Sequence, residues 1–254
     1  LFDNLNFVRH CFSTRVGGVS KGPFESLNLG ATRGDDINNV LTNYKLLSKA
    51  VGFNYNNVVF SGQVHGKEIY HATEKDKGKG LFIESDIKNI DGLMTGTPDI
   101  VLTTFYADCT PLFFVDTAKK IIAISHSGWK GTVLKIGSHT LDEMQAKYNS
   151  ELKDTLIGIG PSLCQECFEV DPPVYHEFES AFDNINLFTA KRGEKYYIDL
   201  KLLIKQMFLD KGVPENNIEV SGYCTKCMPN LFYSHRYSGQ DRGSLAGFIE
   251  LLAD

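Results

Sequence analysis

The sequence predicts an α+β protein that forms a single domain over residues 1–254. Apolar strands that follow one another like the arms of hairpins alternate with segments of helical periodicity, which favours a mixed sheet over an all-parallel one. No internal repeat or low-complexity linker divides the 254 residues. The composition, 42% hydrophobic and 22% charged, is ordinary for a globular protein and is enough for a substantial core.

The elements follow from the spacing of apolar residues along the chain. Short apolar or alternating runs predict strands at residues 7–13, 58–61, 68–73, 101–106, 112–116, 121–126, 155–159, 196–199 and 218–221. Helical periodicity predicts helices at residues 38–51, 132–148, 172–182 and 200–211. We expect the tail, residues 245–252, to form a short helix.

Charge and hydropathy indicate where the protein acts. A formal net charge of −5 argues against nucleic acid or an anionic membrane as the main partner. No apolar run approaches the 18 residues that a membrane span needs. The first residues, Leu1 to Asn4, lack the basic start and apolar segment of a signal peptide. We therefore expect a cytoplasmic location.

The strands at 112–116 and 121–126 are joined by a polar stretch of hairpin length. If Asp116 pairs with Ile121, constant register places His126 opposite Pro111 and diagonal to Cys109. Side chains in that relation are about 7–8 Å apart. The sequence alone therefore predicts that Cys109 and His126 converge.

Three short segments carry one thiol and two imidazoles: Gln63-Val64-His65-Gly66, Ala107-Asp108-Cys109 and His126-Ser127-Gly128-Trp129. This donor set suits Zn²⁺, and three protein ligands leave the fourth position open, as in catalytic zinc sites. Taken singly, each residue is better explained as a buried cysteine or a hydrogen-bonded core histidine than as a metal ligand. The spacing of residues along the sequence does not by itself predict that His65 lies near Cys109 and His126.

Two further cysteine pairs have the spacing of a four-thiolate zinc knuckle. They are Cys164-x-x-Cys167 and Cys224-x-x-Cys227, with 56 residues between them, far more than the usual ~15–20. Free thiols in a reducing compartment are the alternative. Cys11, within an apolar stretch, is most simply a core residue.

Ordered matches along nearly the whole chain resemble the YfiH family, long labelled laccase-domain or multicopper polyphenol oxidases and more recently described as purine nucleoside phosphorylases with adenosine deaminase activity. The matching motifs are Phe12-Ser13-Thr14-Arg15, Ser26-Leu27-Asn28-Leu29-Gly30, Gln63-Val64-His65-Gly66, Asp91-Gly92-Leu93-Met94-Thr95, Ala107-Asp108-Cys109, His126-Ser127-Gly128-Trp129 and Phe232-Tyr233-Ser234-His235-Arg236. The family's closing Thr-Gly-Arg motif is matched only loosely by Gln240-Asp241-Arg242.

The resemblance implies a layered sandwich of two mixed β-sheets flanked by helices. It also implies a zinc ion bound by His65, Cys109 and His126, which are then the catalytic centre. Asp108, beside the thiolate, is our candidate for proton transfer or for orienting an imidazole. The implied substrates are a purine nucleoside and phosphate. The candidate residues that bind them are Ser13, Arg15, Asn28, Gln63, Trp129 and Arg236.

Residue chemistry leaves alternatives open for these side chains. Arg15 can pair with an oxyanion or form a surface salt bridge. Trp129, the only Trp, can stack on a purine or pack in the core. The same ambiguity holds for the His235-Arg236 pair.

Three functions are consistent with these residues. The first is a zinc-dependent purine nucleoside phosphorylase, active on inosine, adenosine, guanosine or methylthioadenosine, with adenosine deaminase side activity. The second is a copper-dependent polyphenol oxidase, although four copper ions would need about ten imidazoles and the chain has seven histidines. The third is a metal-free hydrolase or deamidase with Cys109 as nucleophile and His65 or His126 as base.

Overall fold

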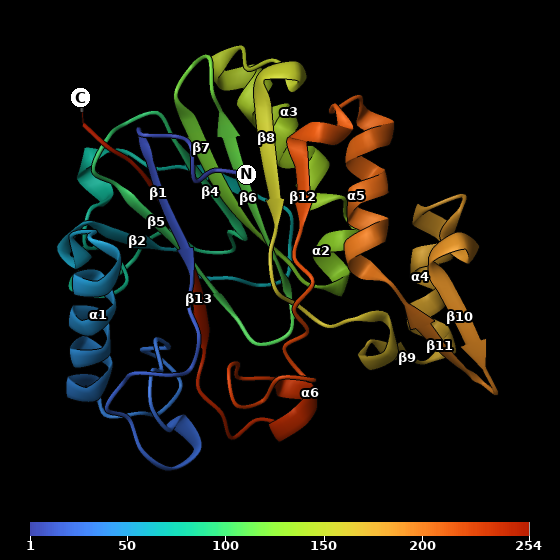
Figure 1. Cartoon of the computed structure of the whole chain (residues 1–254), viewed down its shortest axis with the longest axis horizontal. Helices are drawn as coiled ribbons and strands as arrows, with labels where there is room; N and C mark the ends of the chain where they lie inside the picture. Colours follow the sequence, from blue (N-terminus) through green and yellow to red (C-terminus); the bar gives the residue numbers. More distant parts are fainter. Residues whose placement is uncertain (254) are drawn as a thin grey trace.

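The computed structural model describes residues 1–253, which form two mixed β-sheets and one small antiparallel sheet (Figure 1). The four-stranded sheet has the order β1 (Val8–Phe12), β13 (Leu245–Leu251), β5 (Val101–Tyr106), β2 (Val58–Phe60). The six-stranded sheet has the order β12 (Ile218–Val220), β8 (Thr155–Ile159), β6 (Thr110–Asp116), β7 (Ile121–Ser127), β4 (Gly92–Thr95), β3 (Ile69–His71). The small sheet has the order β10 (Thr189–Arg192), β11 (Lys195–Ile198), β9 (Glu169–Val170).

Both large sheets combine parallel and antiparallel neighbours. In the four-stranded sheet, β2 runs parallel to β5, whereas β13 is antiparallel to both β5 and β1. In the six-stranded sheet the outer pairs β12–β8 and β3–β4 are parallel and the inner pairs are antiparallel. The predicted α+β class with mixed sheets is therefore confirmed.

The two large sheets pack face to face, and helices cover their outer faces. Leu102 and Ile249 of one sheet meet Phe113, Val115 and Ile124 of the other in a buried apolar layer between the sheets. The outer face of the six-stranded sheet packs on α3 (Ile136–Tyr148) and α5 (Leu200–Lys211). The outer face of the four-stranded sheet packs on α1 (Ile37–Val51). The expected sandwich is thus present, as a helix, sheet, sheet, helix arrangement (Figure 1).

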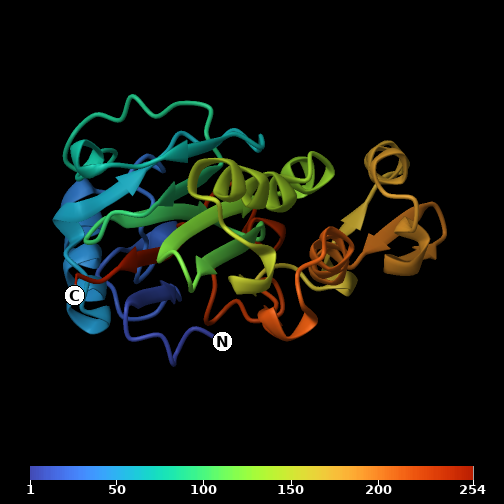
Figure 2. The same ribbon diagram turned by 90° about the horizontal axis from the view of Figure 1, so that it is seen from above.

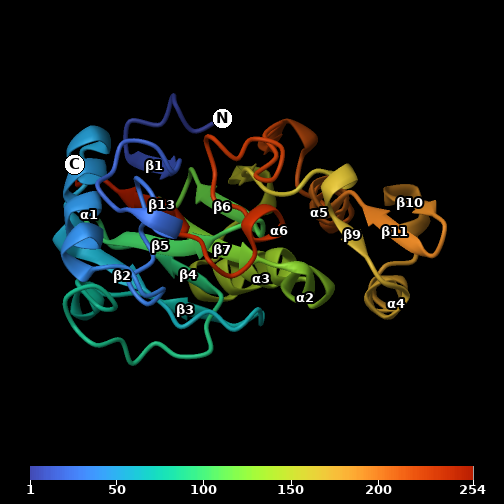
Figure 3. The same ribbon diagram turned by 90° about the horizontal axis from the view of Figure 1, so that it is seen from below.

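The small sheet has a core of its own beside these layers. It packs with α4 (Pro172–Ala181) around Phe178 and Ile198, and this unit lies to the side of α5 (Figure 2). Two short helices complete the fold, α2 (Trp129–Val133) and α6 (His235–Ser238). Seen from below, α6 lies near the ends of β6 and β7 (Figure 3).

The helix boundaries follow local chemistry. Asp36 caps α1 by accepting a hydrogen bond from the backbone N–H of Asn38, and the helix ends at Gly52, whose φ of 96° is in the left-handed region. The helix predicted over 132–148 is instead two helices, because Lys135 has a φ of 57° between α2 and α3. Within residues 1–253, no helix combines the length and the apolar character needed to cross a membrane.

The largest error of sequence reasoning concerns the tail. Residues 245–252 were expected to be helical, but Leu245–Leu251 is β13, a strand buried at every position. It lies between β1 and β5, so both of its edges are paired. A strand buried on both faces reads as a continuous apolar run, which periodicity alone does not distinguish from a short buried helix.

The hairpin register agrees with the sequence prediction. Asp116 pairs with Ile121, and Pro111 pairs with His126. This register places His126 near the end of β7, close to the turn that carries Cys109 into β6.

Candidate active site

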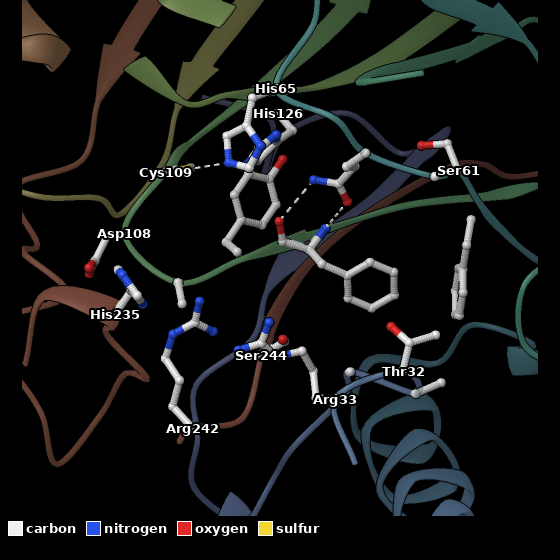
Figure 4. A pocket seen from close by; sticks show the side chains of 18 of the residues that line it. Thr32, Arg33, Ser61, His65, Asp108, Cys109, His126, His235, Arg242 and Ser244 are labelled. Carbon is white, nitrogen blue, oxygen red and sulfur yellow. Dashed lines mark hydrogen bonds between the residues drawn. The ribbon is translucent and has the colours of Figure 1, made fainter. Parts of the chain in front are cut away.

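A cavity of about 950 Å³ opens where the carboxyl ends of β2, β5 and β7 meet. Its walls come from segments far apart in sequence, and Figure 4 shows the side chains that face it. Aromatic side chains contribute much of the apolar wall. They are Phe60, Phe105, Tyr106, Trp129 and Phe168.

One thiol and two imidazoles meet at this cavity. The ligand-capable atoms of His65, Cys109 and His126 all lie within 4.8 Å of one another. The sulfur of Cys109 is 3.9 Å from Nε2 of His65. The ring centroids of His65 and His126 are 4.8 Å apart. Zinc bonds of about 2.0–2.3 Å place the ligand atoms of one ion less than about 4.6 Å apart. The 3.9 Å between the Cys109 sulfur and Nε2 of His65 lies within that limit, and the three donors are of the types that zinc prefers.

A buried carboxylate, that of Asp91, holds two of these three residues. It accepts hydrogen bonds from the backbone N–H groups of Val64, His65 and Gly66 at 2.8–2.9 Å. Its Oδ1 also lies 2.8 Å from Nδ1 of His126. Burial raises the pKa of Asp91, but the His126 and backbone hydrogen bonds outweigh burial and lower it. An ionised Asp91 thus fixes both the His65 loop and the His126 ring.

We expected Asp108 to orient an imidazole, but in the structure it is Asp91 that contacts the His126 ring. Oδ1 of Asp108 accepts a hydrogen bond from the Thr225 hydroxyl at 2.6 Å, and Oδ2 accepts one from the backbone N–H of Arg236 at 2.6 Å. Asp108 has a φ of 94°, in the region that non-glycine residues rarely adopt. Its contacts therefore hold a strained turn immediately before Cys109.

Backbone conformation brings the cluster together at two other positions. His65 has a φ of 61°, and the three hydrogen bonds to Asp91 stabilise that left-handed turn. Gly128 leaves room for the cluster, because a Cβ there would lie 2.7 Å from Cδ2 of His65 and 3.1 Å from the Cys109 sulfur. A glycine is therefore required at position 128 by close approach.

The electrostatics of the cluster favour a thiolate. Burial raises the pKa of the Cys109 thiol, but the charge and hydrogen bond of His126, followed by those of His65, outweigh burial and lower it to about 6. Burial lowers the pKa of His126, but the Cys109 charge and the Asp91 hydrogen bond raise it to about 9. Cys109 is thus prepared as a thiolate, the form that binds metal or attacks an electrophile.

A cationic region lies across the cavity from the imidazoles (Figure 4). Arg33 and Arg242 both line the cavity, and Nε of Arg242 is buried without a hydrogen-bond partner. Burial and then the nearby charge of Arg33 lower the pKa of Arg242 to about 10. Two guanidinium groups that line one cavity have the charge and the hydrogen-bond donors that suit an anion with several oxygens.

Four of the six substrate-binding candidates have structural contacts instead. Ser13 and Asn28 are buried and do not line the cavity: Oγ of Ser13 accepts a hydrogen bond from Ala246, and Oδ1 of Asn28 accepts one from Ser244. Arg15, also outside the cavity, donates to the carbonyl oxygen of Pro229. Gln63 lines the cavity, but both ends of its amide bond the backbone of Phe105.

The other two candidates, Trp129 and Arg236, line the cavity. Trp129 also packs on the apolar core beside the small sheet. Arg236 donates through Nη1 to the carbonyl oxygen of Glu169 at 2.8 Å.

The sequence did not predict Arg33 and Asp91 as residues of the site. Asp91 did carry a signal, because it opens one of the motifs that resemble the YfiH family.

Comparisons with known proteins identify the family to which the chain belongs. Residues 9–252 match the family model described as multi-copper polyphenol oxidoreductase laccase. The chain is 35% identical over 240 residues to purine nucleoside phosphorylase YlmD of Bacillus subtilis, covering 94% of this chain and 86% of that protein. It is 32% identical over 252 residues to an adenosine deaminase of an unknown prokaryotic organism, covering 95% of each.

Two solved structures share the whole fold. The Bacillus licheniformis hypothetical protein YfiH superposes with a TM-score of 0.95 at 32% identity, covering 99% of this chain and 95% of that one. YlmD from Geobacillus stearothermophilus superposes with a TM-score of 0.93 at 31% identity, covering 98% and 93%. The chain belongs to the YfiH family of laccase-like proteins, and its named relatives include purine nucleoside phosphorylases and an adenosine deaminase.

Proposed function

We propose that the protein is a zinc-dependent purine nucleoside phosphorylase with adenosine deaminase side activity. The observation that carries this proposal is that a Cys-His-His donor set and two guanidinium groups face one cavity. The names of the relatives YlmD and adenosine deaminase support the same pair of reactions. We further propose a cytoplasmic location, where reducing conditions keep the thiols free.

Phosphate fits the cationic region. An inorganic phosphate between Arg33 and Arg242 would accept charge-assisted hydrogen bonds from the guanidinium groups that line the cavity. Its negative charge would also offset the repulsion between the two guanidinium groups, which lowers the pKa of Arg242. The arginines would thereby hold the nucleophile of phosphorolysis in place.

A purine nucleoside fits the rest of the cavity. The volume of about 950 Å³ is at the upper end of typical small-molecule sites, large enough for a nucleoside beside phosphate. Trp129 and Phe168 offer aromatic faces on which a purine could stack. The proposed substrates are inosine, adenosine, guanosine and methylthioadenosine.

In phosphorolysis, a phosphate oxygen forms a bond to the anomeric carbon of the ribose, and the bond from that carbon to the purine nitrogen breaks. The electron pair of the broken bond leaves with the purine, which takes up a proton. We assign Asp108 a positioning role here, since both of its oxygens hold neighbouring groups, one of them the backbone of Arg236. Zinc held by His65, Cys109 and His126 would supply Lewis acidity and lower the pKa of water to about 7, which suits deamination.

The test is the release of hypoxanthine from inosine at increasing phosphate concentration. We expect release to saturate with phosphate and to yield ribose 1-phosphate. In Arg242→Gln, loss of a charge-assisted hydrogen bond of about 1.5–3 kcal/mol should raise the KM for phosphate by about tenfold or more. Arg192→Gln, an exposed arginine paired with Glu166, is the matched control and should leave that KM unchanged. Hypoxanthine release that does not depend on phosphate would overturn the proposal.

The reactive thiol favours a second candidate, a metal-free cysteine hydrolase. The pKa of about 6 for Cys109 would make it a thiolate nucleophile, with His126 beside it. Metal analysis together with thiol alkylation separates the two functions. A hydrolase would be fully active without metal and inactivated by alkylation of Cys109, whereas bound zinc would protect this thiol and activity would require the metal.

A copper oxidase has less support. Within residues 1–253, the groups of three or more potential ligands are the Cys109 cluster and a group of four cysteines. Neither provides the imidazole-rich ligand sets that several copper ions would need. An intense thiolate-to-copper band in an anaerobic copper titration would restore this alternative.

A further inference from the structure

Four cysteines that the proposed reaction does not use meet in a second cluster. Cys164 and Cys167 lie in the loop between β8 and β9, and Cys224 and Cys227 lie in the loop after β12. Their four sulfur atoms all lie within 4.8 Å of one another. The Cys227 sulfur is 3.4 Å from that of Cys167 and 3.9 Å from that of Cys164.

The sheet explains how such distant pairs meet. Strands β8 and β12 are parallel neighbours, with Ile157 opposite Ile218, so their carboxyl ends leave the same edge. The pairing continues beyond the strands as a parallel bridge between Ser162 and Cys224, in which the backbone N–H of Thr225 donates to the Ser162 carbonyl oxygen. The 56 intervening residues form the small sheet, α4, α5 and then β12, which returns the chain beside β8 and so brings the two pairs together.

A backbone turn and a backbone hydrogen bond help to hold the four cysteines together. A single 3₁₀ turn at Gln165–Cys167 places both sulfurs of the first pair on one side of the loop. The backbone N–H of Cys164 lies 3.3 Å from the Cys224 sulfur, within hydrogen-bonding distance. Such a bond stabilises negative charge on sulfur and links one pair to the other.

We propose that Cys164, Cys167, Cys224 and Cys227 bind a second zinc ion, with a structural role. Zinc bonded to four thiolates at about 2.3 Å places adjacent sulfurs about 3.8 Å apart in a tetrahedron. The distances of 3.4 and 3.9 Å lie on either side of that value, and no two of the four sulfurs are more than 4.8 Å apart. Four protein ligands fill the coordination sphere, so this ion has no position for substrate.

The second zinc would hold one wall of the active site. Thr225, next to Cys224, donates to the Asp108 carboxylate at 2.6 Å. Leu163, next to Cys164, donates through its backbone N–H to the carbonyl oxygen of Asp108 at 3.3 Å. Both cysteine loops therefore contact the residue that precedes Cys109, and the zinc would position that turn without touching substrate.

The test measures zinc per chain by elemental analysis of protein purified under reducing conditions. We expect two zinc ions per chain in the wild type and one in Cys109→Ala. One is also expected in the double variant Cys164→Ser/Cys227→Ser. Cys11→Ala, which removes a thiol outside both clusters, is the matched control and should retain two.

X-ray absorption at the zinc edge of Cys109→Ala keeps the proposal testable if the double variant does not fold. In Cys109→Ala only the second site remains, and its spectrum should show four sulfur neighbours at about 2.3 Å. No zinc in Cys109→Ala, iron in place of zinc, or a disulfide between the two pairs in reduced wild-type protein would overturn the proposal. One zinc per chain in both the wild type and Cys109→Ala would support this site and would contradict zinc at Cys109 instead.

Discussion

At the scale of single residues, Asp91 organises the candidate active site. One fully buried carboxylate accepts three backbone N–H groups of the His65 loop and also bonds the His126 ring. Metal-bound histidines commonly depend on such a partner for their orientation and basicity. The chemistry of the site therefore rests on a residue that would not itself bind the metal.

We predict that Asp91→Asn weakens zinc binding at the Cys109 cluster by about 10–100-fold. The asparagine has one acceptor oxygen in place of two, and its NH₂ group opposes the N–H donors around it. Competition with a chelator of known affinity measures the effect in a background of Cys164→Ser/Cys227→Ser. Asp116→Asn is the control: Asp116 is also fully buried but accepts hydrogen bonds from the backbone of the β6–β7 turn, so zinc affinity should stay unchanged.

Gly128 supports a second prediction at this scale. In Gly128→Ala the added Cβ would lie 2.7 Å from Cδ2 of His65, so the imidazole must shift. A misplacement of about 1 Å lowers kcat/KM on the order of 10²-fold, and phosphorolysis of inosine measures the loss. Gly222→Ala, where a Cβ meets nothing within 4 Å, should keep wild-type kcat/KM. Equal activity in the two variants would contradict the close approach at residue 128.

At the scale of elements, local patterns predicted what local contacts determine. The β6–β7 hairpin and its register followed from a short polar loop between two apolar runs, and that register placed His126 beside Cys109. Long-range features left no such signal. The position of β13 between β1 and β5 depends on strands more than 100 residues away, and the contact of Arg33 with the cavity depends on the packing of whole layers.

The central position of β13 predicts a high cost for truncating its side chains. Phe248 is 1% exposed and stacks on Phe53 with ring centroids 5.0 Å apart. We expect Phe248→Ala to lower the free energy of unfolding by about 3–5 kcal/mol, measured by urea denaturation. Leu187→Ala, at a side chain that is 73% exposed, should change it by less than about 0.5 kcal/mol. If Phe248→Ala lowers the free energy of unfolding only slightly, β13 would not have the central position described here.

At the scale of the whole molecule, the cavity depends on a long connection between two neighbouring strands of the six-stranded sheet, β3 and β4. The segment from β3 to β4 contributes Glu84, Ser85 and Lys88 to the cavity wall. Asp76 anchors this segment by accepting hydrogen bonds from Thr73, Tyr70 and Lys79. Burial raises the pKa of Asp76, but these hydrogen bonds, led by that of Lys79, outweigh burial and lower it.

This lowered pKa predicts how stability changes with pH. The ionised Asp76 stabilises the fold above its pKa in the unfolded chain, and that contribution is lost as pH falls through the lower pKa of the folded state. At neutral pH, the free energy of unfolding of Asp76→Asn should therefore be about 1–3 kcal/mol lower than that of the wild type. This difference should shrink in strong acid. Urea denaturation along a pH series measures it. Asp210→Asn, an exposed carboxylate on α5, should show no such trend.

The placement of β13 also affects how the chain is made. The ribosome synthesises this strand after every other strand of the four-stranded sheet, yet β1 and β5 both need it as a neighbour. Until it emerges, those two strands present open edges, which attract other chains. A nascent polypeptide that stalls before residue 245 would therefore be prone to aggregation and a natural client for a chaperone.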